Sequence, residues 1–145
     1  MTTTMLSSLR YLAGTAGPSG FGSRTTAEEA TDGAGDLSHI TAIVTGATSG
    51  IGAETARVLA KRGARLVLPA RNLKAAEDAR ARLLAELGPG TDAGRVVVLP
   101  LDLSSLGSVR RFARRFLALR LPLNLLMCVR PSAHSPRRCR RYHHN

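Results

Sequence analysis

Residues 45–52, TGATSGIG, decide the fold. They follow ITAIV at residues 40–44, an apolar, β-branched run that is typical of a strand buried on both faces. They lead into GAETARVLAKRG at residues 52–63, where apolar residues recur at helical spacing. A glycine-rich turn between a buried strand and a helix has the context that a phosphate-binding turn requires. The alternative is a turn with a structural role only.

Each glycine of this turn has a physical reason to be there. Gly46 lets the backbone leave the strand in a tight turn, Gly50 lets the backbone approach a pyrophosphate, and Gly52 lets the helix pack close to the sheet. The free N–H groups at the helix start then bind the anion. Since three glycines, Thr and Ser hydroxyls and the strand–helix context coincide, the sequence predicts dinucleotide binding.

Strand and helix patterns alternate from residue 40 to residue 127. Strands are predicted at residues 64–71, 95–103 and 123–129, and helices at residues 72–88 and 104–119. Because crossovers between parallel strands are right-handed, this order predicts an α/β fold, a doubly wound parallel sheet of about four strands and three helices. Pro69 lacks an N–H group and is expected at the exposed carboxyl end of its strand.

The periodicity also predicts which residues of each helix face the core. The expected inward residues are Ile51, Thr55, Val58 and Leu59 in the first helix, Leu73, Ala76, Leu83, Leu84 and Leu87 in the second, and Leu106, Val109, Phe112, Ala113, Phe116 and Leu117 in the third.

The end of the predicted second strand indicates which dinucleotide is preferred. A site for NAD places an acid there for the ribose 2′-hydroxyl, about 20 residues beyond the glycines. This chain instead has Arg71, with Asn72 beside it. Because a guanidinium pairs with a 2′-phosphate, NADP(H) is favoured over NAD(H). The alternative is that Arg71 is a solvated surface residue.

A further polar position, Asp102, follows the third strand in the stretch LDLSS at residues 101–105. An Asp at a strand–helix junction accepts from an adenine amino group, or favours the next helix N-terminus through the helix dipole. The two roles are compatible.

The charge divides the chain unevenly. The 145 residues carry a net charge of +11, and residues 103–145 hold ten arginines and no acid. Residues 1–38, rich in hydroxyl residues and with no acid before Glu28, are expected to be a flexible or transit-like extension. Residues 39–127 are expected to be a partial dinucleotide-binding domain and residues 128–145 a basic disordered tail.

Several kinds of partner are not predicted. No apolar run approaches the ~18 residues of a membrane span. The basic tail lacks the interleaved aromatic residues of a stacking platform, so specific nucleic-acid binding is not expected. Cys128, His134 and Cys139 include no close ligand pair, so no metal site is predicted.

These motifs carry a family resemblance, which covers about residues 18–127. TGATSGIG resembles the nucleotide motif of the short-chain dehydrogenase/reductase family, and LDLSS resembles its adenine-site motif. More narrowly, GPSGFGSRTTAEEATDG, ARN and LPLNLL are similar to the plant group associated with the chloroplast inner-envelope import complex, which is close to retinol-dehydrogenase-like reductases.

The resemblance implies a Rossmann fold, NADP(H), carbonyl or alcohol substrates and a chloroplast location, with the cytoplasm as the alternative. It assigns Gly46, Ser49, Gly50, Ile51 and Gly52 to the pyrophosphate, Arg71 and Asn72 to the 2′-phosphate, and Asp102 and Leu103 to the adenine.

The family's pattern is not followed after residue 127. In the family the fourth strand continues into Asn-Asn-Ala-Gly, and a catalytic Ser and a Tyr-x-x-x-Lys follow. Here residues 128–131 read CVRP, and neither Tyr11 nor Tyr142 has a lysine four residues later. The sequence therefore predicts the N-terminal half of a Rossmann domain, without catalytic residues.

Three interpretations of the chain remain open on this basis. It is either the NADP(H)-binding portion of an oxidoreductase, or a non-catalytic module that binds NADP(H) or a partner protein, or a non-functional splice or gene-model product. The expected strand order 3-2-1-4 leaves the fourth strand at the edge of the sheet, which favours self-association.

Overall fold

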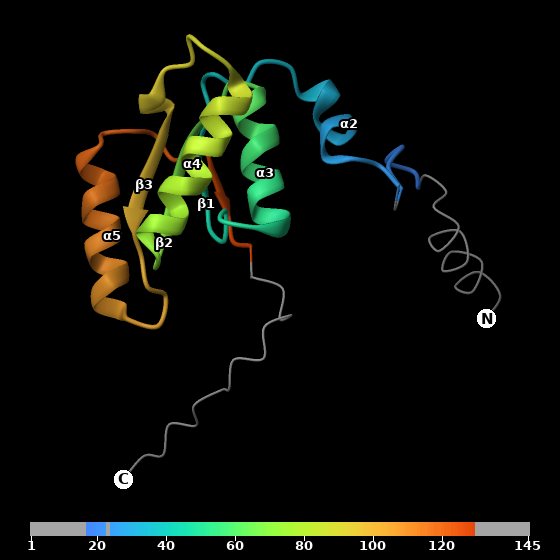
Figure 1. Cartoon of the computed structure of the whole chain (residues 1–145). Helices are drawn as coiled ribbons and strands as arrows, with labels where there is room; N and C mark the ends of the chain where they lie inside the picture. The colour runs from blue at the N-terminus through green and yellow to red at the C-terminus, as the bar shows by residue number, and fades with distance from the viewer. Residues whose placement is uncertain (1–16, 23, 130–145) are drawn as a thin grey trace, which may run out of the picture.

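The computed structural model describes residues 17–22 and 24–129, in which four parallel strands form one sheet in the order β3-β2-β1-β4 (Figure 1). In the register Ile43 lies opposite Val67 on one side and Leu126 on the other. The predicted doubly wound parallel sheet is therefore confirmed. The elements are α2 Ala27–Thr31, a 3-10 turn Asp32–Ala34, β1 Thr41–Val44, α3 Gly50–Lys61, β2 Arg65–Ala70, α4 Leu73–Leu87, a 3-10 turn Ala93–Arg95, β3 Val96–Pro100, α5 Leu106–Ala118 and β4 Leu125–Met127.

Helices cover both faces of the sheet. On one face α3 and α4 pack Ala56, Ala60 and Leu83 against strand residues such as Val44 and Leu66. On the other face Phe116 of α5 packs against Ile43 and Val67. All four residues of β1 are buried, as the apolar run predicted. The helix ends also follow the sequence, because the Asn72 side chain caps α4 and Gly63 and Gly88 follow α3 and α4 with φ of 98° and 87°.

Pro69 has its predicted place along the strand but not its predicted exposure. It is the penultimate residue of β2, at the carboxyl end as predicted, but it is buried and lies opposite Leu99 of β3. The Ala70 carbonyl accepts from Leu101 on the β3 side, so the alternate residue Pro69 directs its nitrogen toward β1. The last β1–β2 register pair is Ile43 with Val67. The N–H group that proline lacks would therefore point toward β1 beyond the last residue pair of β1 and β2. A buried proline is tolerated at this position for that reason.

Three of the predicted inward faces need correction. Ile51 is 76% exposed, because α3 places the small residues Gly52, Ala56 and Ala60 against the sheet instead. Leu73 at the start of α4 is 45% exposed. On α5 the inward residues are Val109, Phe112 and Phe116, whereas Leu106, Ala113 and Leu117 are exposed. These three form one flank of α5, which no described element covers.

The segment before residue 39 contains a short helix, α2, which contacts α3. That residues 1–38 form a flexible or transit-like extension stays a prediction. The Thr26 side chain and Glu29 form a capping box at the start of α2. Glu28 pairs with Arg57 at 2.9 Å and with Lys61 at 2.6 Å, both on α3, and Asp32 pairs with Arg62. Residues 26–32 are therefore fixed to α3 by charge. The remainder of the predicted extension, residues 1–16 and 23, lies outside the described residues.

We expect the docking of α2 to depend on pH through Glu28. Hydrogen bonds from Lys61 and Arg57 lower the pKa of Glu28 from 4.5 to about 2. A carboxylate with a depressed pKa contributes stability that is fully present above its unfolded pKa and is lost as pH falls through its folded pKa. Glu28→Gln should therefore lower the thermal midpoint at pH 6 and have little effect near pH 2.

The matched control for this measurement is Glu86→Gln, since Glu86 is exposed and forms no ion pair with any described residue. Its effect on the thermal midpoint should be small at both pH values. A Glu28→Gln effect that is the same at pH 6 and near pH 2 would show that the ion pairs do not hold α2.

Candidate functional site

The loop that links β1 to α3 forms the centre of the candidate site. Gly46 and Gly50 have φ of 65° and 56°, the left-handed region that favours glycine. A Cβ on Gly52 would lie 2.3 Å from the Gly46 carbonyl oxygen, so the first turn of α3 contacts the loop backbone directly. Two of the three roles proposed for the glycines, the tight turn and the close packing, thus match the geometry.

The start of α3 leaves its N–H groups available to an anion. Ser49 is the N-cap residue in extended conformation, but its side chain makes no capping hydrogen bond, and the first turn contains no acid. The partial positive charge of the helix N-terminus is therefore not compensated by the helix's own residues. Ile51, in this first turn, is exposed. Such a terminus attracts a phosphate group.

Arg71 and Asn72 follow β2 at the same edge of the sheet. Arg71 is exposed, and its guanidinium makes no hydrogen bond or ion pair with any described residue. The Oδ1 of Asn72 accepts from the Ala75 N–H at 3.1 Å, so this oxygen caps α4. The amide NH₂ of Asn72 is left to donate elsewhere.

Asp102 and Leu103 follow β3. One oxygen of Asp102 accepts from the Ser104 N–H at 3.0 Å and from the Ser104 hydroxyl at 2.7 Å. These bonds, and to a lesser extent the charge of Arg71, hold the pKa of Asp102 below its usual value, so the group is a carboxylate at neutral pH. Its second oxygen is a free acceptor among the described residues. Leu103 is 70% exposed and presents an apolar surface beside it.

One hollow of about 410 Å³ brings most of these residues together. Gly46, Arg71, Asn72, Asp102 and Leu103 line it, and they come from the carboxyl ends of β1, β2 and β3. The remaining predicted residues, Ser49, Gly50, Ile51 and Gly52, lie in the adjoining first turn of α3 and its cap rather than in the lining. The volume lies within the range of small-molecule sites.

The lining also contains eight residues that the sequence did not assign to the site, namely Thr45, Thr48, Pro69, Ala70, Ala75, Leu101, Ser104 and Val129. Thr45, Thr48 and Ser104 belong to the predicted motifs, and their hydroxyls were the available signal. No signal indicated Val129, whose N–H donates to the Thr45 hydroxyl oxygen at 3.0 Å. Cys128 and Val129, which end the predicted strand 123–129 and begin the predicted tail, continue from β4 along the end of β1. Residues 130–145 lie outside the described residues.

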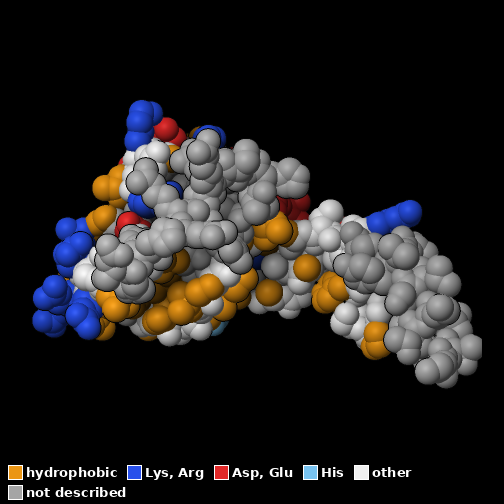
Figure 2. Space-filling view, turned by 90° about the horizontal axis from the view of Figure 1, so that it is seen from below, with side chains coloured by type: hydrophobic (Ala, Val, Ile, Leu, Met, Phe, Trp, Pro, Cys, Tyr) orange, Lys and Arg blue, Asp and Glu red, His pale blue; other side chains and the backbone are white. Residues whose placement is uncertain are grey.

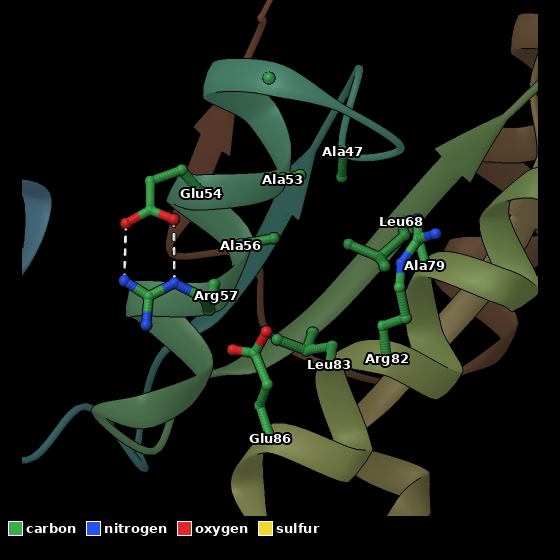
Figure 3. A pocket seen from close by; sticks show the side chains of 11 residues that line it. Ala47, Ala53, Glu54, Ala56, Arg57, Leu68, Ala79, Arg82, Leu83 and Glu86 are labelled. Carbon is green, nitrogen blue, oxygen red and sulfur yellow. Dashed lines mark hydrogen bonds and ion pairs between the residues drawn. The ribbon is translucent and has the colours of Figure 1, made fainter.

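A second hollow, of about 240 Å³, lies between α3 and α4 (Figure 3). Alanine and leucine side chains form its floor, and Glu54, Arg57, Arg82 and Glu86 stand at its rim. Glu54 and Arg57 bind each other through two hydrogen bonds of 2.9 and 2.6 Å. Of the predicted site residues only Gly50 lines this hollow. The two hollows thus share no lining residue, and only Gly50 connects this one with the candidate nucleotide site.

Neither a metal site nor a membrane span is found in the part of the chain that the structure describes. Residues 17–22 and 24–129 contain no group of three or more His, Cys, Asp or Glu side chains suited to a metal ion. None of the helices in these ranges combines the length and the apolar character that crossing a bilayer requires.

Comparison with known proteins gives the family. Residues 40–129 match the sequence profile of the family described as short chain dehydrogenase. Because this match covers more than half of the 145 residues, the chain belongs to the short-chain dehydrogenase/reductase family. The chain is 52% identical over 114 residues to "Short-chain dehydrogenase TIC 32 B, chloroplastic" of Brassica napus, covering 79% of this chain and 34% of that protein. It is 50% identical over 93 residues to the WW domain-containing oxidoreductase of Danio rerio, covering 64% of this chain and 22% of that protein.

Solved structures agree with this assignment. The Pseudomonas aeruginosa RhlG/NADP active-site complex is similar with a TM-score of 0.54 and 35% identity, over 63% of this chain and 33% of that one. The menthone neomenthol reductase from Mentha piperita is similar with a TM-score of 0.55 and 35% identity, over 60% of this chain and 30% of that one. The chain thus spans about a third of the length of the chloroplastic relative and of these structures.

Proposed function

We propose that the chain is the NADP(H)-binding portion of a short-chain dehydrogenase/reductase that acts on carbonyl or alcohol substrates. The observation that carries the proposal is the hollow at the carboxyl edge, where Gly46, Arg71 and Asp102 from three successive strand ends line one space. Dinucleotides bind at this edge of doubly wound sheets. The RhlG structure is a complex with NADP, which supports NADP(H) as the cofactor. The chloroplastic name of the Brassica napus relatives supports a chloroplast location, with the cytoplasm as the alternative.

Each predicted residue has a role in this proposal. The first-turn N–H groups of α3 hold the pyrophosphate, with Ser49, Gly50, Ile51 and Gly52 in that turn and Gly46 in the loop before it. Arg71 and the Asn72 amide bind the 2′-phosphate. The free oxygen of Asp102 accepts from the adenine amino group, and the exposed side chain of Leu103 covers the adenine ring. Burial of Leu103 against the ring is favourable because it removes apolar surface from water.

Calorimetric titration of the purified chain with NADPH and with NADH tests the proposal. Binding of NADPH with a higher affinity than NADH is the expected result. If neither dinucleotide binds at millimolar concentration, the edge is not a nucleotide site and the proposal fails.

We expect no turnover from the 145-residue chain with any carbonyl or alcohol substrate. Proton transfer in the family needs the Tyr-x-x-x-Lys pair, and this sequence has none. The measurement is NADPH oxidation followed by absorbance with a panel of aldehydes and ketones. Turnover that survives Tyr142→Phe and Tyr11→Phe and is absent from a mock purification would require an acid that we have not identified.

We also propose that the chain self-associates through the free edge of β4. The Met127 carbonyl accepts from the Thr45 N–H, so the alternate residues Leu126 and Cys128 direct their backbone groups away from β1. An exposed strand edge is a template for pairing with another chain. Sedimentation velocity at tens of micromolar should show concentration-dependent oligomers.

Leu126→Lys should shift this equilibrium toward the monomer, because a lysine on an edge strand opposes pairing. Leu123→Lys is the matched control, since Leu123 is similarly exposed, at 48% against 55%, but lies outside the strand. A wild-type chain that stays monomeric over the whole concentration range would contradict the proposal.

A further inference from the structure

The tripeptide Asp-Leu-Ser occurs twice in the chain, at residues 36–38 and 102–104. The first copy precedes β1, at the amino edge of the sheet, and the second follows β3, at the carboxyl edge. In both copies the serine N–H and the serine hydroxyl donate to the aspartate two residues earlier. The same local contact is therefore present in two different surroundings.

The two copies differ in how many carboxylate oxygens the serine binds. In the first copy the Ser38 N–H donates to Oδ1 of Asp36 at 3.0 Å and the Ser38 hydroxyl donates to Oδ2 at 2.7 Å, so both oxygens are engaged. In the second copy the Ser104 N–H and hydroxyl both donate to Oδ1 of Asp102, at 3.0 and 2.7 Å. Among the described residues Oδ2 of Asp102 has no hydrogen-bond donor. Ser104 thus holds the carboxylate through one oxygen and leaves the other available.

Neighbouring serines hold the backbone of Asp102 as well. The Asp102 N–H donates to the Ser108 hydroxyl oxygen at 2.9 Å, and the Asp102 carbonyl accepts from the Ser105 N–H at 3.2 Å. Ser105 in turn caps α5, because its hydroxyl oxygen accepts from the Ser108 N–H at 3.3 Å. These contacts join the end of β3 to the first turn of α5. The side chain of Asp102 is the part that could still turn, and Ser104 restricts it.

The available oxygen of Asp102 belongs to the nucleotide edge. Asp102 and Ser104 line the hollow of about 410 Å³ together with Arg71. Figure 2 views the molecule from the side toward which the carboxyl ends of the strands point in Figure 1, and basic side chains are more widespread than acidic ones on this face. A carboxylate oxygen accepts hydrogen bonds and repels phosphate. On such a face it suits a donor group of the ligand, whereas the basic side chains suit its phosphates.

We propose that Ser104 is a positioning residue, which holds Asp102 so that its second oxygen meets the adenine amino group and rejects a base with a carbonyl in that place. This role rests on the proposed function, NADP(H) binding at this edge. Adenine carries an amino donor where hypoxanthine carries a carbonyl oxygen, and hypoxanthine has an N–H on the adjoining ring nitrogen. A carboxylate held in one orientation repels that carbonyl, whereas a carboxylate that can turn accepts from the adjoining N–H. Ser104 therefore makes the site selective for adenine dinucleotides.

Calorimetric titration of the full 145-residue chain with NADPH and with its hypoxanthine analogue tests this role. The wild-type chain should bind NADPH at least about tenfold more tightly than the analogue, which is the lower end of the effect of one hydrogen bond to a charged group. Ser104→Ala removes the hydroxyl bond of 2.7 Å. It should reduce the preference for NADPH to within about threefold, and Ser104→Thr, which keeps a hydroxyl, should restore it. Circular dichroism confirms that each variant is folded.

Ser38→Ala is the matched control, because it removes a hydroxyl bond of the same 2.7 Å length from the same tripeptide at the opposite edge. It should leave the preference within about twofold of the wild-type value. An unchanged preference in Ser104→Ala would overturn the positioning role.

A double variant separates positioning from direct contact. If Ser104 acts through the carboxylate, Ser104→Ala should change the NADPH affinity of an Asp102→Ala chain by less than about twofold. Additive losses would show that Ser104 contacts the nucleotide itself and would overturn the positioning role. These outcomes differ from failure of the proposed function, in which the wild-type chain binds neither dinucleotide.

Discussion

Arg71→Asp should reverse the cofactor preference of the chain. The guanidinium of Arg71 is exposed, has no partner among the described residues, and borders the hollow that Asp102 also lines. A hydrogen bond to a charged group contributes about 1.5–3 kcal/mol, and about 1.4 kcal/mol is a tenfold change in affinity. Loss of the arginine should thus weaken NADPH binding roughly 10- to 100-fold, and repulsion by the new carboxylate adds to this loss. NADH binding should be unchanged or improved, since an acid at this position accepts from the ribose 2′-hydroxyl.

Titration calorimetry with both dinucleotides measures this reversal. Arg82→Asp is the matched control, because Arg82 lies on α4 beside the separate hollow between α3 and α4. The control makes the same change of charge and should leave the ratio of NADPH to NADH affinity within about twofold. If the Arg71→Asp chain still binds NADPH more tightly than NADH, other residues bind the 2′-phosphate and the role proposed for Arg71 is incorrect.

Gly52→Ala should destabilise the fold more than Gly50→Ala does. The new Cβ would lie 2.3 Å from the Gly46 carbonyl oxygen and 2.7 Å from its carbon, and these are backbone atoms that cannot rotate away. Overpacking costs about 1–3 kcal/mol and occasionally more, whereas the gain in helix propensity from Gly to Ala is about 1 kcal/mol. The net cost is therefore up to about 2 kcal/mol, and because the clash is with backbone atoms we expect the upper end of this range, a fall in the thermal midpoint of roughly 8–16 °C at about 4–8 °C per kcal/mol.

Gly50→Ala is the informative comparison. A Cβ on Gly50 meets no atom within 4 Å, so its cost is limited to the left-handed φ of 56°, about 1–2 kcal/mol. The added methyl group would occupy the space assigned to the pyrophosphate, and NADPH binding should be lost while the fold is retained. If Gly52→Ala proves no more destabilising than Gly50→Ala, the close contact of α3 with the loop is not rigid.

The strands and the site loops were predictable because their signals are local. The β-branched runs around Val44 and Val97, and the glycines that end α3 and α4, each specify their element from within a few residues. The glycine turn, Arg71 and Asp102 follow strand ends, and parallel strands bring their carboxyl ends to one edge. The predicted residues at these three ends therefore meet in one hollow.

The side-chain directions of α3 and α5 and the docking of α2 depend on contacts with other elements, which local sequence patterns do not indicate. Hydrophobicity favoured Ile51 as an inward residue of α3, but the buried residues of this helix are Gly52, Ala56, Val58 and Ala60, and Ile51 lies away from them in the exposed first turn. Helical spacing marked the whole apolar side of α5, although only the part over β2 and its neighbours is covered. The docking of α2 rests on Glu28 meeting residues 29 and 33 positions later, a pairing that periodicity does not indicate.

The ion pairs of α2 also limit where the N-terminal part of the chain can be removed. A leader-processing protease that cut after Thr26 would remove the capping residue, and one that cut after Glu28 would separate Arg57 and Lys61 from their shared carboxylate. If the proposed chloroplast location holds and a transit segment is removed, a mature protein with an intact α2 would begin at or before Thr26. Mass spectrometry of protein recovered from isolated plastids would locate this boundary.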